Sequence, residues 1–179
     1  MFFFFILCVE MARESRWLPI VFSIVLMTAC LDDVREDDGL AVGDALPSFS
    51  VSMNDGTTIT TTDLMGHSSV IMFFSVTCPD CQAELPVVQR LWNVTDRTAV
   101  PIILIARGQR YEDIEPYWQS AALTMIYSPQ SDWRVYNLFA KSRIPRIYIN
   151  DSEGVIRYIH TDAPLPSFET LQEEIRSLR

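Results

Sequence analysis

The chain has 179 residues, which is enough for one domain with a sizeable hydrophobic core and too few for two ordinary domains. About half of the residues (49%) are apolar, as in a globular protein, and this composition argues against extensive disorder. The formal net charge of -9 and the single lysine, Lys141, argue against a nucleic-acid-binding surface, because binding to phosphates requires clustered cations.

Two apolar runs open the chain, at residues 2–9 and 17–29, and both are shorter than the ~20 residues of an ordinary membrane span. The second run follows arginines and ends in LMTAC, which resembles a bacterial lipoprotein signal with Cys30 as the lipidated residue. We therefore expect residues 1–29 to be a signal peptide, with Met11 as an alternative start of translation. The competing interpretation of the second run is a buried helix or an uncleaved anchor.

The segment after Cys30 is acidic (LDDVREDDG) and carries too little apolar surface to fold by itself. We expect residues 30–41 to form a tether and residues 42–179 to form the domain. Acyl chains on Cys30 would bind a membrane without spanning it, so the predicted location is the bacterial cell envelope, with the domain facing the periplasm or the cell exterior.

The domain alternates predicted strands and helices. Alternating or continuous apolar patterns predict strands at residues 49–53, 57–61, 69–75, 100–106, 123–127, 145–150 and 154–160. Helical spacing of apolar residues predicts helices that begin at Pro79, cover 113–122 and 132–139, and close the chain from about Phe168. This order predicts an α/β fold with a mixed central sheet, helices on both faces and an added N-terminal β-hairpin.

A Cys-x-x-C motif, Cys78-Pro79-Asp80-Cys81, lies where the strand at 69–75 meets the helix that follows it. The spacing suits a redox pair, half of a metal site or two buried thiols. Only His67 and His160 could add metal ligands, and they lack ligand spacing, so we expect neither a metal site nor a cofactor.

The chain resembles the thioredoxin-fold family, and within it the membrane-anchored thiol-disulfide oxidoreductases called TlpA-like or ResA-like. The resemblance covers about residues 42–179 and rests on the segments GDALPSFSV and CPDCQAELP, the Ile144-Pro145 step, and the hairpin INDSEGVIRY. It implies that Pro145 is the cis-proline opposite the cysteines and that Glu84 is the acidic residue beneath the active site. One departure is Thr77, because many relatives carry tryptophan immediately before the first cysteine.

Because the motif lies at the start of a helix, we expect the two sulfurs to have different roles. Unpaired N–H groups and the helix dipole favour a thiolate at Cys78, the expected nucleophile, whereas the carboxylate of Asp80 opposes it. Cys81 lies one turn further in and would resolve the mixed disulfide by forming a Cys78–Cys81 disulfide. Glu84 would accept the proton of the Cys81 thiol.

The sequence thus predicts an extracytoplasmic enzyme that reduces protein disulfides and receives electrons from an upstream membrane donor. A second enzyme hypothesis is a peroxiredoxin-like peroxidase, which needs threonine and proline where this chain has Ser75 and Ile71. A third hypothesis is a non-catalytic binding module of the cell envelope with a structural disulfide. Trp92, Trp118 and Trp133 are expected to be packing residues on helices.

Overall fold

The computed structural model describes residues 39–179, so the predicted signal peptide, the start at Met11 and the lipidation of Cys30 lie outside the described residues. The backbone of Gly39 pairs with Ala140, and the amide of Leu40 donates to the Phe139 carbonyl at 2.8 Å. Chain contacts with the domain are therefore present three residues before the expected boundary at residue 42. Within the described range, no helix has both the length and the apolar character needed to cross a membrane.

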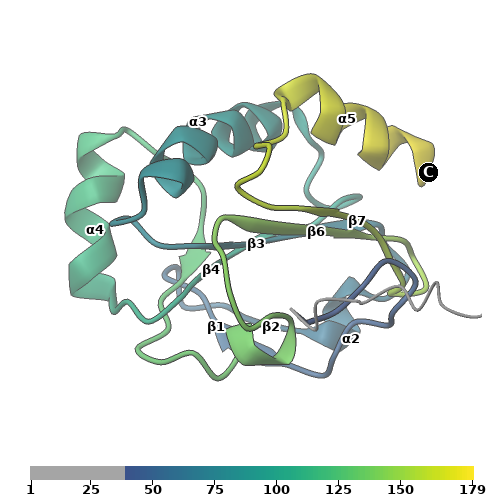
Figure 1. The fold of residues 1–179 in the computed structure, drawn as a ribbon, viewed down its shortest axis with the longest axis horizontal. Helices are drawn as coiled ribbons and strands as arrows, with labels where there is room; N and C mark the ends of the chain where they lie inside the picture. The colour runs from purple at the N-terminus through teal and green to yellow at the C-terminus, as the bar shows by residue number, and fades with distance from the viewer. Residues whose placement is uncertain (1–38) are drawn as a thin grey trace, which may run out of the picture. The chain divides into compact units, whose positions relative to one another are not determined.

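A five-stranded mixed sheet forms the centre of the fold, with the strand order β5-β4-β3-β6-β7 (Figure 1). β3 is parallel to β4, which is parallel to β5, whereas β6 is antiparallel to β3 and β7 to β6. The strands are β3 (Ser69–Phe74), β4 (Ile102–Ala106), β5 (Tyr127–Ser128), β6 (Arg146–Asn150) and β7 (Ile156–His160). Every residue of β3 is buried, as its apolar run predicts for a central strand covered on both faces.

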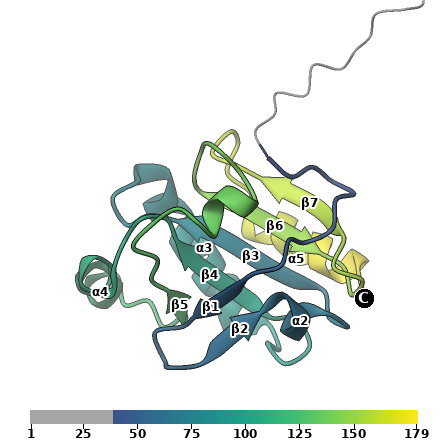
Figure 2. The same cartoon turned by 90° about the horizontal axis from the view of Figure 1, so that it is seen from below.

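Two long helices, α3 (Pro79–Val94) and α5 (Phe168–Ser177), lie along one face of this sheet (Figure 1). Proline suits the first position of α3 because the first amide of a helix has no intrahelical partner. Leu85, Val88 and Leu91 point into the core at the spacing of a helix face. A third helix, α4 (Tyr111–Ser120), lies next to the β5 edge (Figure 2).

The opposite face carries the short hairpin of β1 (Ser50–Ser52) and β2 (Thr58–Thr60), followed by α2 (Thr61–Leu64). The hairpin forms a separate antiparallel sheet, and its turn contains Gly56 at a φ of 88°, a conformation that glycine adopts without strain. Hydrogen bonds attach it to the central sheet, since the Ser128 hydroxyl donates to the Ser52 carbonyl at 2.7 Å. The expected thioredoxin-like fold, with its added N-terminal hairpin, is confirmed.

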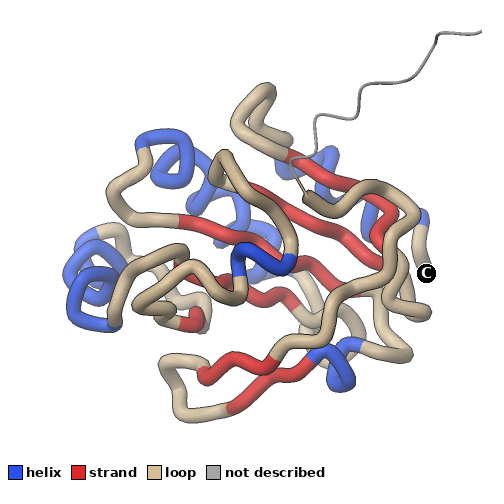
Figure 3. Tube along the Cα trace, turned by 60° about the horizontal axis from the view of Figure 1, so that its bottom comes forward, coloured by secondary structure: helices blue, strands red, loops and turns tan. Residues whose placement is uncertain are grey.

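The segment between β5 and β6 differs from the expectation. A helix over 132–139 is wrong: the segment is mostly loop (Figure 3) and holds only the 3-10 turn η1 (Tyr136–Leu138). Tyr136 and Phe139 are buried against the ring of Phe73, with centroids 5.3 and 4.9 Å away. The strand expected at 123–127 is also shorter, because Leu123 still bonds to the carbonyl of Trp118 at the end of α4.

Candidate active site

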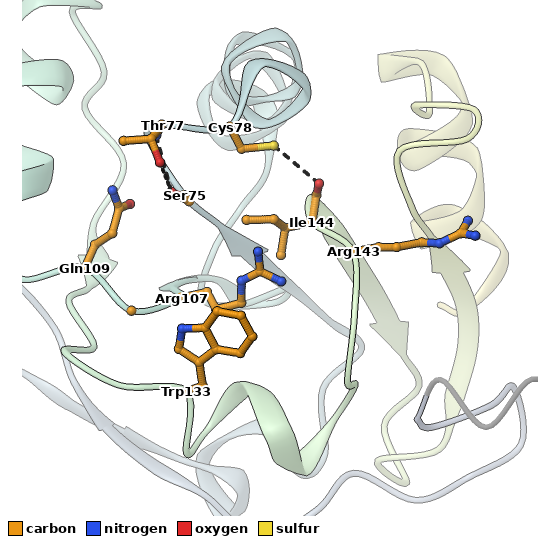
Figure 4. A pocket seen from close by; sticks show the side chains of 9 residues that line it. Ser75, Thr77, Cys78, Arg107, Gln109, Trp133, Arg143 and Ile144 are labelled. Carbon is orange, nitrogen blue, oxygen red and sulfur yellow. Dashed lines mark hydrogen bonds between the residues drawn. The ribbon is translucent and has the colours of Figure 1, made fainter.

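Cys78 is the N-cap of α3 and lies at the end of the short loop that follows β3. Its side chain is half-buried, and its Sγ donates a hydrogen bond to the Ile144 carbonyl at 3.4 Å (Figure 4). Cys81 lies one turn further into the helix and is completely buried. Both are free thiols. Solvent therefore reaches the side chain of Cys78 but not that of Cys81.

Side-chain hydrogen bonds hold the backbone of Val76 through both its N–H and its carbonyl, and they fix the loop in front of Cys78. Its N–H donates to Gln109 Oε1 at 2.8 Å, and its carbonyl accepts from Gln82 Nε2 at 2.6 Å. Gln109 is buried and comes from the segment after β4, whereas Gln82 belongs to α3. Two elements thus hold the two peptide groups that flank the Val76 Cα, which fixes the backbone of the loop that leads to Cys78.

The thiol of Cys81 is poorly suited to ionise by itself. Burial raises the pKa of Cys81 far above its usual range. The hydrogen bond from the Ser75 backbone lowers the pKa, and the neighbouring Cys78 raises it; the charge of Arg107 has a smaller lowering effect. Cys81 therefore remains protonated at neutral pH, and any reaction that requires its thiolate would need a base nearby.

Glu84 lies three residues after Cys81, on the same face of α3, and is only 1% exposed. Burial raises its pKa from an ordinary value of 4.5 to about 7. Its Oε1 is buried and accepts no hydrogen bond from any residue between 39 and 179. A carboxyl group with a pKa of about 7 can both accept and release a proton at neutral pH.

The Ile144–Pro145 peptide bond is cis, as the resemblance implied. The loop before it is attached to the core by Tyr136, whose hydroxyl donates to the carbonyls of Ser142 and Arg143, the latter at 2.7 Å. Since the Ile144 carbonyl accepts the bond from Cys78, these contacts also position the backbone opposite the sulfur. The site thus brings together residues from three distant segments, around 78, 109 and 144.

A pocket of about 530 Å³ opens beside Cys78 (Figure 4). Its lining combines Ser75, Thr77, Cys78, residues 107–109, Trp133, Arg143 and Ile144. Trp133 is not the packing residue that the sequence predicted: it is 47% exposed and faces this pocket, whereas Trp92 and Trp118 are buried as expected. An aromatic surface therefore lies next to Cys78 although position 77 holds threonine.

Sequence reasoning also missed Arg107 and Gln109, which follow β4. A usable signal existed, because β3 and β4 are parallel and in register from Val70 to Phe74, so the segments after them meet at the same edge of the sheet. Neither histidine lines the pocket beside Cys78, and the ring of His160 in β7 instead forms a hydrogen bond with Glu174 in α5 at 2.7 Å. Residues 39–179 contain no cluster of three or more side chains that could hold a metal ion.

Comparisons with known proteins agree with this architecture. Residues 42–159 match the model of the AhpC/TSA family. The thiol-disulfide oxidoreductase ResA of Geobacillus thermodenitrificans is 22% identical over 175 residues, which cover 94% of this chain and 99% of that protein.

Solved structures give the same result for the fold. A thiol:disulfide interchange protein of the thioredoxin family from Chlorobium tepidum has a TM-score of 0.61 at 20% identity and covers 78% of this chain and 98% of its own. The exposed lipoprotein thioredoxin of Streptococcus pneumoniae has a TM-score of 0.64 at 15% identity and covers 74% and 100%. The resemblance seen in the sequence is confirmed.

Proposed function

Because the chain belongs to the AhpC/TSA family and has a thioredoxin-like fold, we propose that it is an extracytoplasmic thiol-disulfide oxidoreductase that reduces protein disulfides through Cys78 and Cys81. The observation that carries the proposal is the difference in access between the two thiols: Cys78 is half-buried at the start of a helix, and Cys81 is sealed one turn behind it. The oxidoreductase class itself follows from the family and from the ResA relative.

The reaction begins when the Cys78 thiolate attacks one sulfur of a client disulfide. A mixed disulfide forms between Cys78 and the client, and the other client sulfur leaves as a thiolate. Cys81 then loses its proton to Glu84 and attacks the Cys78 sulfur, which releases the second client sulfur. The client gains two electrons and the protein is left with a Cys78–Cys81 disulfide, which a membrane electron donor must reduce.

Pro145 contributes through its backbone neighbour. The Ile144 carbonyl, which precedes the proline nitrogen, faces the Cys78 sulfur and accepts the proton of the resting thiol in a hydrogen bond. A client disulfide must approach the Cys78 sulfur along this edge and the adjacent pocket.

The membrane attachment belongs to the proposal as well. We propose that residues 1–29 are removed, that Cys30 is lipidated, and that the acidic tether links it to the domain on the outer side of the membrane. Its support is the LMTAC sequence after an apolar run. Mass spectrometry of the membrane fraction tests it, since a mature N-terminus at diacylated Cys30 is expected and a retained leader would contradict it.

The peroxidase alternative has less support. The place of its required proline is taken by Ile71, which is completely buried in the middle of β3. We expect the reduced protein to consume hydroperoxide no faster than a Cys78→Ser variant does.

The decisive experiment is the equilibrium reduction potential of the Cys78–Cys81 pair, measured in dithiothreitol buffers with Cys78→Ser as the control. A reversible two-electron transition at about -270 mV or lower supports a reductase, whereas about -120 mV indicates an oxidase. If no disulfide forms, the catalytic hypothesis loses its main support. A disulfide that forms but resists reduction well below about -300 mV would favour the binding module with a structural bridge.

A further inference from the structure

Arg107 lines the pocket beside Cys78 and lies against two aromatic rings. Its guanidinium carbon is 4.5 Å from the ring centroid of Trp133 and 5.0 Å from that of Tyr136. The side chain rises from the end of β4 into the space between Trp133 and Ile144 (Figure 4). Cation–π contacts of this kind fix the faces of the guanidinium and leave its N–H edges available to a ligand.

The support for Arg107 is itself rigid. The ring of Trp133 packs against the backbone of Gly108, where an added Cβ would lie only 2.6 Å from Trp133 Nε1. Gly108 has a φ of 68°, and its amide donates to the Asp132 carbonyl at 3.2 Å. Tyr136 is buried and meets Trp133 edge to face at 6.1 Å. The cationic group is therefore preorganised, which reduces the entropy lost when it binds a ligand.

The charges around the pocket are unusual for this protein. The chain carries a net charge of -9, yet the pocket lining holds two arginines and no acidic side chain. The side chain of Arg143 extends away from the Cys78 sulfur, so Arg107 is the cation that faces the reacting group (Figure 4). No ion pair within residues 39–179 involves Arg107. Its ability to bind a carboxylate through two parallel hydrogen bonds is thus unused.

We propose that Arg107 is a specificity-determining residue that binds a carboxylate of the client, so that preferred clients carry an aspartate or glutamate next to the reacting cysteine. The proposal rests on the proposed disulfide reductase function. The exposed ring of Trp133 adds an apolar surface for the client backbone beside the same contact. The occupant is a polypeptide disulfide, as the proposed function requires, and the exposed Thr77 and half-buried Cys78 of the pocket lining are accessible to it.

The test uses the full chain in detergent, reduced beforehand, with two synthetic disulfide peptides that differ only in a glutamate or a glutamine next to the reacting cysteine. The second-order rate constant for each peptide is divided by its rate constant with dithiothreitol, which removes intrinsic differences in reactivity. We expect the glutamate peptide to react about 5- to 10-fold faster, as one charge-assisted contact at a partly exposed site allows. The preference should shrink at high salt.

Arg107→Gln is expected to bring the ratio of the two rates to about 1. Because both peptides meet the same sulfurs, a general effect of Arg107 on the cysteines cancels in this ratio. The control is Arg134→Gln, since Arg134 follows Trp133 in the chain but pairs with Asp132 at 2.7 Å and is not part of the pocket lining. It should leave the ratio unchanged.

The outcomes separate the two proposals. If both peptides are reduced equally well by the unaltered protein, or if Arg107→Gln keeps the glutamate preference, the specificity role is wrong and the reductase function stands. If neither peptide is reduced although dithiothreitol reduces both, the proposed function fails and the inference fails with it. The comparison of peptides with the unaltered protein needs no variant, so the specificity role can be refuted even if Arg107→Gln does not fold.

Discussion

Replacing Glu84 with glutamine keeps the size of the side chain and removes its ability to ionise. The structure gives this change two measurable consequences, because Glu84 is buried and its pKa is raised to about 7. One consequence concerns the stability of the fold, and the other concerns the second step of the reaction. Both depend on pH, and their signs can be derived from the same shift.

The stability argument follows from proton linkage. Between pH 4.5 and 7 the glutamate of the unfolded chain is ionised while Glu84 in the fold remains protonated, so the free energy of unfolding falls as the pH rises. Each tenfold difference in proton affinity is worth about 1.4 kcal/mol, which gives an upper estimate of about 3 kcal/mol for the whole shift. Glu84→Gln should match the parent protein below pH 4.5 and be more stable by up to about 3 kcal/mol above pH 7.

The same replacement that stabilises the fold should slow the resolution of the mixed disulfide. Glu84 accepts a proton only when it is ionised, so the rate of mixed-disulfide resolution should rise with pH through about 7. In Glu84→Gln this step should slow about 100-fold at pH 8 and lose that pH dependence. The assays are urea unfolding at pH 4 and 8 and rapid-quench trapping of the mixed disulfide across the same range.

Glu112→Gln, an exposed glutamate of α4, serves as the matched control and should change neither quantity. Two results would refute the reasoning about Glu84. One is a difference in unfolding free energy between Glu84→Gln and the parent that is the same at pH 4 and pH 8. The other is an unchanged rate of resolution, which would mean that water or another group accepts the proton of Cys81.

Three further predictions concern the geometry around the sulfurs. Gln109→Leu leaves the buried N–H of Val76 without an acceptor, and should lower the free energy of unfolding by about 1–3 kcal/mol in urea titrations. Cys81→Ser should accumulate a client mixed disulfide on Cys78, visible by mass spectrometry as a stable adduct. Tyr136→Phe keeps the ring but loses the hydroxyl bonds to the loop before the cis-proline, and should cost about 1–2 kcal/mol and slow client reduction.

Each of these variants has a control in the same chain. Gln119→Leu removes a bond that Gln119 makes to a carboxylate on the surface, and should cost much less than Gln109→Leu. Tyr158→Phe removes a hydroxyl that meets Ser177 at the surface, so its activity should be unchanged. Cys78→Ser should form no adduct. Three results would contradict the assigned contacts. They are an equal loss of unfolding free energy in Gln109→Leu and Gln119→Leu, an equal loss of activity in Tyr136→Phe and Tyr158→Phe, and an adduct on Cys81 in Cys78→Ser.

The centre of the sheet could be predicted because β3 and β4 are continuous apolar runs. Val70 to Phe74 are all completely buried, and the same continuity marks Ile102 to Ala106 as the neighbouring strand. The motif at residues 78–81 and the helix after it could also be predicted, since proline and the apolar spacing identify where α3 begins and which face it buries. These patterns are local, and they predict the structure correctly where the same apolar side chains are also buried in the core.

The loop at 132–139 could not be predicted from its own residues. Trp133, Tyr136 and Phe139 recur every three residues, a spacing that suits an α-helix face as well as a 3-10 turn. The outcome depends on distant partners: Phe139 packs on Phe49, which precedes β1, and on Phe73 of β3. The role of Trp133 was missed for the same reason, because a ring that supports Arg107 has no signature within its own segment.

The stability of the fold does not explain why a glutamate occupies position 84. A buried carboxyl oxygen without a hydrogen-bond partner destabilises a core, and a similarly shaped apolar side chain would remove that cost. The same α3 face holds Cys81, a buried thiol whose pKa is raised by burial and which must lose a proton to react. In the proposed mechanism these two groups, each costly where it lies, act together, because the thiol gives its proton to the buried carboxylate instead of to solvent. The raised pKa of Glu84 then lets it return that proton near neutral pH, which a surface glutamate with an ordinary pKa of 4.5 could not do as readily.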